Sequence, residues 1–253
     1  MRARKRFGQH FLVDEAVLDN IVRHIQPRRL DRVLEIGPGR GALTRLLCGE
    51  LEELHGIELD RDLIEGLARQ HPNLVLTQAD VLAVNLPEYL ALGDWRLVGN
   101  LPYNLSSPLL LALAPLGGSI IDMHFMLQRE LAARLAATPG TKSWGRLSVM
   151  LQRFWEVEAL FDVPPDAFNP PPKVMSQVVR MVPRKDQLQL QDEAVFKALV
   201  AAAFGQRRKT LRNSLRDYSI DYPQFGLTAN QRAEEVSVEQ FVAMSNSIAS
   251  RSG

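Results

Sequence analysis

Short runs of hydrophobic residues alternate with amphipathic segments through the first half of the chain. The run 33–36 is stopped by the glycine-rich stretch 37–41, and the segment 42–47 after it has the spacing of a helix. The same order of strand and helix recurs further along, which is typical of parallel strands joined by right-handed crossovers. The pattern therefore predicts a doubly wound α/β sheet. Its expected strands lie at 33–36, 54–58, 74–76, 96–100 and 120–127, and its helices at 42–47, 61–69, 107–113 and 128–136.

The pattern changes twice in the second half of the chain. Its period shortens toward two at 147–157 and 174–182, which predicts late antiparallel strands. The proline-rich stretch 164–172 can be neither a helix nor a central strand, because proline lacks the amide hydrogen that both need. After Pro183 the pattern becomes helical. The expected domains are 1–183, with the sheet, and a small all-helical domain at 184–253, with helices at 193–204, 209–218, 229–234 and 238–248.

Composition places the chain among ordinary globular proteins. Of its 253 residues, 46% are hydrophobic and 23% are charged, which excludes wholesale disorder. No hydrophobic run approaches the ~20 residues that cross a bilayer, and the basic start leads into no apolar secretion segment. The single cysteine, Cys48, can form neither an internal disulfide nor a cysteine-based metal site. We therefore expect a cytoplasmic protein with no membrane segment and no metal.

Charge is distributed unevenly along the chain. The net charge is +1, yet residues 1–10 carry four basic and no acidic side chains, and residues 11–182 carry 16 basic against 21 acidic ones. An acidic body with basic ends allows a polyanion to be gripped locally. The candidate contacts for a polyanion are Arg4, Lys5 and Arg6 in the arm 1–10, and Arg207, Arg208, Lys209, Arg212 and Arg216 near the C-terminus. The C-terminal cations fall within one short helical stretch, where spacings such as 208/212 and 209/212/216 would place several of them on one face.

Candidate binding residues follow the first two expected strands, at the edge where open α/β sheets bind their ligands. Gly37 and Gly39 let the backbone turn sharply and approach a ligand closely. Their spacing, GxGxG, differs from the GxGxxG that receives a dinucleotide pyrophosphate. Glu58 ends the second strand, 19 residues beyond Gly39, where a carboxylate can accept from both hydroxyls of a ribose. NAD and S-adenosylmethionine (SAM) share that ribose, so Glu58 alone leaves both cofactors open.

The next two strand ends favour one chemistry. Asp80 can accept a hydrogen bond from an adenine amino group or act as a helix cap for the next segment. The fourth strand ends in Asn100-Leu101-Pro102-Tyr103. An exocyclic base amine is a poor nucleophile because its lone pair is delocalised into the ring. The Asn100 oxygen and the Leu101 carbonyl could accept its two N–H groups and release that lone pair, and Tyr103 offers a stacking face worth roughly 1–3 kcal/mol. An NAD-dependent oxidoreductase would give this motif no role.

With these motifs the chain resembles the KsgA/RsmA-type small-subunit (16S) rRNA adenine N6,N6-dimethyltransferases, a branch of the class I SAM-dependent methyltransferases. The resemblance implies a Rossmann-like fold and methyl transfer from SAM to N6 of two adjacent adenines in the 3′-terminal hairpin of 16S rRNA, during 30S biogenesis. A large-subunit rRNA dimethyltransferase of the antibiotic-resistance type is the alternative. An assembly factor that has lost catalysis would not need Glu58, Asp80 and the NLPY motif. The resemblance covers essentially the whole chain and rests on 5–12 (KRFGQHFL), 35–44, 99–108 (GNLPYNLSSP), 168–180 (FNPPPKVMSQVVR) and 204–215 (FGQRRKTLRNSL).

The resemblance also implies roles for single residues and for the two domains. The family usually has asparagine where this chain has His10, whose protonation would then matter. Domain 1–183 would bind SAM and catalyse, and domain 184–253 would bind the rRNA of an immature 30S subunit, as a monomer. SAM would be held by His10, Leu12, Gly37, Gly39, Glu58, Asp80 and Asn100, and the target adenine by Asn100, Leu101, Pro102, Tyr103 and Phe168.

Three other residues are predicted to be structural. His124 lies within an apolar run and is expected to be a core histidine with its hydrogen bonds satisfied. Trp144 and Trp155 are expected to pack against the sheet, with an RNA contact as the alternative for Trp144 in its glycine-flanked loop.

Overall fold

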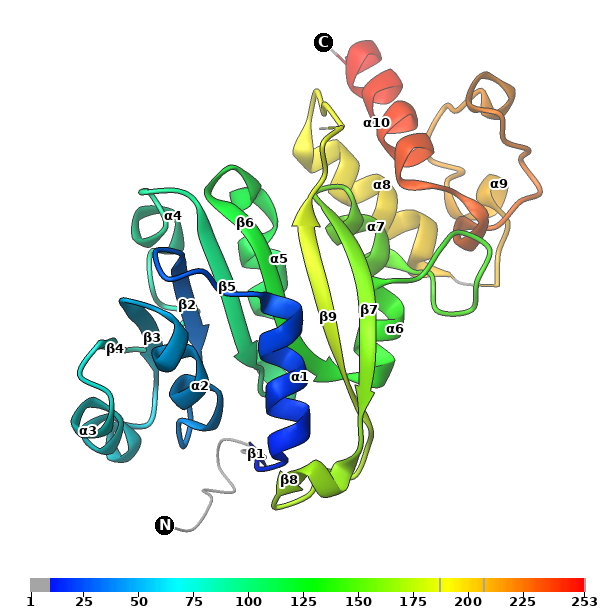
Figure 1. The fold of residues 1–253 in the computed structure, drawn as a ribbon. Coiled ribbons are helices and arrows are strands. Elements are labelled where there is room, and N and C mark those ends of the chain that lie inside the picture. The colour runs from blue at the N-terminus through cyan, green and yellow to red at the C-terminus, as the bar shows by residue number, and fades with distance from the viewer. Residues whose placement is uncertain (1–9, 187, 207, 253) are drawn as a thin grey trace. The chain divides into compact units, whose positions relative to one another are not determined.

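The structure is a computed structural model that describes residues 10–186, 188–206 and 208–252. It contains a mixed sheet flanked by helices and, further along the chain, a group of helices (Figure 1). In chain order the elements are β1 (Phe11–Leu12), α1 (Glu15–Ile25), β2 (Arg32–Ile36), α2 (Ala42–Glu50), β3 (Leu54–Glu58), α3 (Arg61–Gln70), β4 (Leu74–Gln78), α4 (Leu86–Tyr89), β5 (Trp95–Asn100), α5 (Tyr103–Leu113), η2 (Ala114–Ser119), β6 (Ile120–Gln128), α6 (Arg129–Leu135), α7 (Arg146–Gln152), β7 (Trp155–Val163), η3 (Pro165–Ala167), β8 (Phe168–Asn169), β9 (Ser176–Pro183), α8 (Glu193–Gly205), α9 (Leu211–Ser214), η4 (Tyr222–Phe225), η5 (Ala233–Glu235) and α10 (Val238–Ser252).

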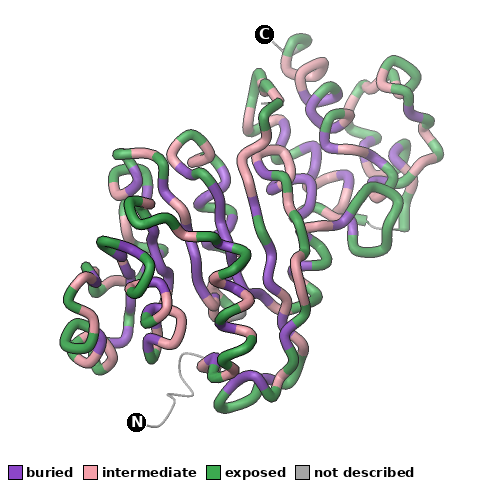
Figure 2. The backbone as a smooth tube through the Cα atoms, viewed as in Figure 1, coloured by how far each residue is buried: buried purple, intermediate pink, exposed green. Residues whose placement is uncertain are grey.

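The sheet has the predicted doubly wound arrangement. Its seven strands run in the order β4-β3-β2-β5-β6-β9-β7, and the pairs from β4 to β6 are parallel. Strand β9 pairs antiparallel with β6, as expected for a late strand. Helices cover both faces, so the central strands are buried on both sides (Figure 2) and read as continuous hydrophobic runs. The α/β fold class predicted from the sequence is confirmed.

The N-terminal segment joins the proline-rich loop. Strand β1 pairs antiparallel with β8, with Phe11 opposite Asn169 and Leu12 opposite Phe168. Helix α1 follows, and its N-cap Asp14 accepts a hydrogen bond from the Val17 amide at 3.1 Å. The buried face of α1 lies on the same hydrophobic cluster as the strands β2, β5 and β6. A short ribbon and a helix therefore cover the edge of the sheet where the glycine-rich turn lies.

The chain divides into two compact units. The sheet unit contains the residues up to Ala132 and Glu156–Pro183, and the helical unit contains Ala133–Trp155 and Arg184 onward. One of their boundaries follows Pro183, where the sequence pattern changes. The segment 133–155, however, groups with the C-terminal helices, although the predicted domain 1–183 placed it with the sheet.

The segment around α7 explains this difference. A strand was predicted at 147–157, but residues 146–152 form a helix. Buried Ser148 accepts from the Gly145 amide at 3.1 Å and donates to the Arg134 carbonyl at 2.6 Å, which fixes the start of that helix. Trp144 is buried in the helical core, and its Nε1 donates to the Val236 carbonyl at 3.0 Å. The prediction that Trp144 packs against the sheet is therefore wrong.

Candidate functional site

The carboxyl ends of the central parallel strands open into a cavity of about 300 Å³ within the sheet unit. Its walls come from β1, α1, the turn after β2 and the ends of β3, β4 and β5. This is the edge at which open α/β sheets bind ligands, because the strand order reverses there. The predicted site residues that line the cavity are His10, Leu12, Gly37, Gly39, Glu58, Asp80, Asn100, Leu101, Pro102 and Phe168.

The turn after β2 brings bare backbone to the cavity. Gly37 and Gly39 have φ values of +69° and +61°, a backbone conformation that residues with a Cβ rarely adopt. A Cβ on Gly39 would lie 3.3 Å from the ring of Phe11. The guanidinium of Arg40 lies over the same ring, 4.3 Å from its centroid. The turn is thus tightly held beneath β1.

Glu58 is held in place by backbone amides. Its Oε2 accepts from the Gly39 N–H at 3.0 Å, and its Oε1 accepts from the Asp60 N–H at 2.8 Å. The residue is only 6% exposed. Each carboxylate oxygen can accept more than one hydrogen bond, so both can still accept one from a hydroxyl group of a ligand in the cavity. The geometry suits a pair of neighbouring hydroxyl groups.

Asp80 lies at the far end of the cavity and is exposed. Its Oδ1 accepts from the Leu82 amide at 3.0 Å. The predicted helix cap is not formed, because residues 81–84 make a turn and the next helix, α4, begins only at Leu86. The Asp80 carboxylate holds this turn and also lines the cavity. The bond to Leu82 leaves acceptor capacity on the carboxylate, so Asp80 can still accept a hydrogen bond from a ligand.

Asn100 has a fixed amide orientation. Its Nδ2 donates to the His10 carbonyl at 2.9 Å. Because a carbonyl can only accept, the group facing it must be the amide nitrogen, and the amide oxygen of Asn100 is left for another partner. Gly99 lets this strand end pass close to β2, since a Cβ there would lie 2.5 Å from the Ile36 oxygen. The Leu101 amide donates to the Met126 carbonyl at 3.2 Å, which orients the following peptide. The side chain of Tyr103 lies outside the described part of the structure.

The ribbon β1–β8 supplies His10 and Phe168. The Nδ1 of His10 lies 2.8 Å from the Pro170 carbonyl. Because a carbonyl can only accept, Nδ1 carries a proton and donates this hydrogen bond. Phe168 is 4% exposed and belongs to the hydrophobic cluster beneath α1 while also lining the cavity. The side chain of His10 is therefore used to hold the ribbon together, and its backbone carbonyl orients Asn100.

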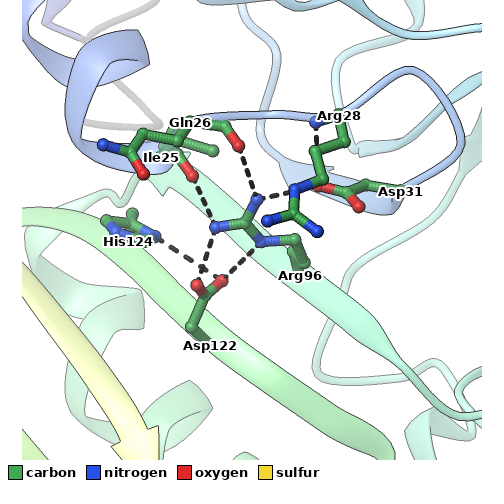
Figure 3. Close-up of polar contacts among 7 residues, drawn as sticks. All are labelled: Ile25, Gln26, Arg28, Asp31, Arg96, Asp122 and His124. Carbon is green, nitrogen blue, oxygen red and sulfur yellow. Dashed lines mark hydrogen bonds and ion pairs between the residues drawn. The ribbon is translucent and has the colours of Figure 1, made fainter.

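Helix α1 is anchored at its far end by one arginine (Figure 3). Arg96 on β5 makes a bidentate pair with Asp122 on β6, at 2.9 and 2.7 Å, and a third bond to Asp31 at 2.8 Å. The same guanidinium donates to the carbonyls of Ile25 and Gln26, which end α1 and have no partner within the helix. Arg96 thus fixes the helix whose other end carries β1 over the cavity.

A model of the family described as ribosomal RNA adenine dimethylase matches residues 1–250. The chain belongs to this family. The ribosomal RNA small subunit methyltransferase A of Nitrosospira multiformis is 49% identical over 247 residues, which cover 96% of this chain and 95% of that protein. The resemblance inferred from the sequence motifs is confirmed.

Two solved structures have the same fold. A dimethyladenosine transferase from Plasmodium falciparum has a TM-score of 0.79 at 24% identity, over 93% of this chain and 96% of its own. The 23S rRNA methyltransferase ErmE has a TM-score of 0.74 at 26% identity, over 94% and 99% of the two chains. Both likenesses extend over nearly the whole chain.

Two buried polar residues at the cavity were not predicted as site residues. Glu35 on β2 is 2% exposed, and burial raises its pKa to about 7, although a hydrogen bond from Thr44 opposes the shift. His124 on β6 also lines the cavity, and burial lowers its pKa to about 4. His124 is buried as predicted, but the prediction that its hydrogen bonds are satisfied is wrong. Neither ring nitrogen has a hydrogen-bond partner among the described residues, and Asp122 Oδ1 lies 3.7 Å from Nδ1.

The C-terminal basic segment differs from the predicted helix. The helix α9 spans only Leu211–Ser214, so Arg208 and Lys209 precede it and Arg216 follows it. Thr210 forms a bridge with Arg232, and the Leu211 amide donates to the Gln231 carbonyl at 2.7 Å, so the neighbouring loop delays the start of the helix. The prediction that these cations share one helix face is therefore wrong, although Arg208, Lys209, Arg212 and Arg216 are all exposed. Arg4, Lys5, Arg6 and Arg207 lie outside the described residues.

Neither a metal site nor a membrane span is found in the part of the chain that the structure describes. Within residues 10–186, 188–206 and 208–252, acidic, histidine and cysteine side chains do not gather in threes as a metal site would require. No helix in those ranges is both long and apolar enough to cross a bilayer.

Proposed function

We propose that this chain transfers methyl groups from SAM to N6 of two adjacent adenines in the 3′-terminal hairpin of 16S rRNA, giving N6,N6-dimethyladenines. Membership of the rRNA adenine dimethylase family supports the reaction class. The 49% identical relative is named for the small subunit, whereas the 23S rRNA enzyme is 26% identical. These identities support the small-subunit substrate over the large-subunit alternative.

The donor groups of the cavity suit SAM. Glu58, fixed by two backbone amides, would accept from both ribose hydroxyls, and Asp80 at the far end would accept from the adenine amino group. The turn of Gly37 and Gly39 presents backbone without side chains between these two and Asn100. When bound, SAM supplies a methyl group activated by its sulfonium charge. His10 and Leu12 would close the cavity from the side of β1.

The observation that carries the proposal is the orientation of the Asn100 amide. Because Nδ2 is engaged by the His10 carbonyl, Oδ1 is the end that can accept from a target amine. Together with the Leu101 carbonyl it would take both N–H groups and localise the lone pair on nitrogen, toward the methyl group. Positioning and electrostatics of this kind supply most of the needed rate for such a transfer. Tyr103 and Phe168 would stack on the flipped adenine, whose extraction from its stack costs a few kcal/mol.

The same pocket must admit the base twice. After one methyl transfer the amine keeps one N–H, which either acceptor can still receive. The amine releases its proton after it has attacked, so no strong general base is needed beside Asn100. His124 would be a poor base in any case, because its pKa is lowered to about 4 by burial.

The helical unit would bind rRNA through its exposed cations. Arg208, Lys209, Arg212 and Arg216 lie in and around α9 and would contact phosphates without reading bases. Arg4, Lys5, Arg6 and Arg207 would add to this charge. We further propose that the chain acts in the cytoplasm as a monomer on immature 30S subunits, since one chain provides every residue assigned above.

Incubation with labelled SAM tests this function. Undermethylated 30S subunits should accept four methyl groups each, two on each of two adenines, and nucleoside analysis should show N6,N6-dimethyladenosine. Undermethylated 50S subunits provide the matched control and should stay unlabelled. Labelling of 50S subunits instead would favour the large-subunit alternative, and no transfer to either would overturn the proposed activity.

A further inference from the structure

Four carboxyl groups of the described residues line the cavity, and one of them differs from the others. Glu58 and Asp80 accept hydrogen bonds from backbone amides, and Asp60 caps α3 by accepting from the Asp62 amide at 3.1 Å. Glu35 accepts one bond, from the Thr44 hydroxyl at 2.7 Å. Glu35 is also the most buried of the four, so water compensates its negative charge least. Glu35 is therefore the carboxyl with the least support for its charge.

The surroundings of Glu35 make its protonated and ionised forms nearly equal in free energy near neutral pH. It is 2% exposed, and burial raises its pKa to about 7, with a further upward contribution from Glu58. On α2, burial and the charge of Glu35 raise the pKa of the Cys48 thiol to about 11, so this neighbour stays neutral. His124, which pairs through Val98 with Glu35 across the sheet, is neutral as well.

Cations at the cavity do not neutralise Glu35. Arg40 places its guanidinium over the Phe11 ring, and His10 is engaged with the Pro170 carbonyl. No ion pair to Glu35 occurs among the residues that the structure describes. A buried carboxyl in this position can ionise fully only if a cation enters the cavity.

The order of the strands indicates which part of the cofactor comes near Glu35. Strands β4, β3, β2 and β5 are adjacent in that order. If the adenine lies at Asp80 after β4 and the ribose at Glu58 on β3, the next strand is β2, which carries Glu35. The target amine lies beyond it, at Asn100 on β5. On that placement the cationic sulfonium of SAM would lie over β2, between ribose and target. The ammonium and carboxylate of the amino-acid end are common to SAM and SAH and do not enter the comparison between them.

We propose that Glu35 is a charge-sensing specificity residue: it gives up a proton to solvent when cationic SAM binds and takes one back when neutral S-adenosylhomocysteine (SAH) is left. The inference rests on the proposed use of SAM. Methyl transfer turns the sulfonium into a neutral thioether and moves the positive charge to the target amine. The Glu35 carboxylate then loses its partner, which weakens the hold of the cavity on the product. The chain thereby distinguishes SAM from SAH, which differs by one methyl group and one charge.

The sign of the pH dependence follows from this linkage. With a pKa of about 7 in the free protein, Glu35 is roughly one-tenth ionised at pH 6 and nine-tenths at pH 8. If the SAM complex contains the carboxylate, affinity for SAM should rise about tenfold between these pH values. Affinity for SAH should rise by a clearly smaller factor, because SAH lacks the sulfonium charge.

Calorimetry on the full chain tests the proposal, with SAM, SAH and sinefungin, an analogue that carries an ammonium group in place of the sulfonium. Titrations in two buffers of different ionisation enthalpy at pH 7 measure the protons released. The unmodified protein should release protons with SAM and sinefungin and fewer with SAH. Glu35→Gln should abolish this release and reduce the SAM-to-SAH affinity ratio at pH 8 severalfold. The control Glu65→Gln changes an exposed carboxylate on α3 and should behave like the unmodified chain.

Two results would overturn the inference. One is an affinity for SAM that is flat from pH 6 to 8 with no proton release, and the other is an equal reduction of SAM and SAH affinity in Glu35→Gln. Absence of SAM binding at every pH would instead overturn the cofactor assignment itself. If Glu35→Gln does not fold, Thr44→Val removes the hydrogen bond that lowers the Glu35 pKa. The pH midpoint of SAM binding should then move upward, and an unmoved midpoint would count against Glu35.

Discussion

The cavity of the sheet unit and the basic segment of the helical unit carry their charges in opposite ways. In the cavity, Glu58 is 6% exposed and accepts hydrogen bonds from two backbone amides. In the basic segment, the side chain of Arg216 is 78% exposed, and Asp217 lies 3.7 Å from it. Buried charges interact strongly because little water screens them, whereas exposed ion pairs are worth about 0–1 kcal/mol each. A small cofactor therefore depends on a few fixed groups, and a polyanion depends on many loosely held ones.

The largest effect is expected at the reacting end of the cavity. Asn100→Ala removes the acceptor that the His10 carbonyl orients, and the single-turnover rate at saturating SAM should fall about 10²–10³-fold, the scale of removing one preorganised polar group. Binding of 30S subunits should change far less, because this role is exercised on the target amine. Quench-flow measurements on both proteins check this. An unchanged rate would refute the assigned chemistry.

The next effect concerns stability and depends on pH. Folding raises the pKa of Glu35 from 4.5 to about 7, so the folded chain holds a proton that the unfolded chain releases, and stability falls as pH rises through that window. Glu35→Gln cannot titrate. It should therefore raise the free energy of unfolding by about 3 kcal/mol at pH 8 and by under about 1 kcal/mol at pH 5, relative to pH 4. Chemical denaturation at the three pH values measures the difference, and an equal effect at pH 5 and pH 8 would show that the carboxyl is not titrating there.

A smaller effect is expected at the ribose end. Glu58→Ala leaves two backbone amides without their acceptor and should weaken SAM binding by about 1–3 kcal/mol. Glu58→Gln keeps one oxygen acceptor and should fall between the alanine variant and the unmodified chain. NAD should bind none of the three proteins. Calorimetry that found equal SAM affinities, or binding of NAD, would contradict the assignment of this carboxylate.

The same contrast separates what the sequence could predict from what it could not. The parallel strands and the turn of Gly37 and Gly39 follow local rules of period and glycine placement, and they lie where they were expected. Glu35 sits within a hydrophobic strand pattern, and only the folded arrangement, in which it lines the cavity together with Leu18 and Ile21 of α1, shows that it is buried there. Its sequence position alone gives no sign of its charge state.

The errors lie where distant residues override the local pattern. The period-two stretch near Val149 forms a helix because Ser148 is held by the Arg134 carbonyl. The expected helix from Lys209 begins only at Leu211, because Thr210 is extended in a bridge with Arg232 and the loop at 229–231 accepts hydrogen bonds from the Leu211 and Arg212 amides. Neither hydrogen-bonding partner lies within a local window of sequence. Residues far apart in the chain decided both segments.

The smallest effect per residue is expected in the basic segment, where it should appear mainly as a change in salt dependence. Arg208 and Lys209 are exposed and precede α9. Replacing both with alanine should weaken 30S binding and reduce the slope of log affinity against log salt by about 0.7–0.9 for each phosphate that is no longer neutralised. The double variant Lys185→Ala/Lys197→Ala removes the same charge from elsewhere in the helical unit and should leave the slope nearly unchanged. Affinity for SAM should be equal in all three proteins, because the cavity is formed by the sheet unit alone. If both double variants lower the slope equally, net charge rather than this segment governs binding, and the contrast between a fixed cavity and a defined docking segment would fail.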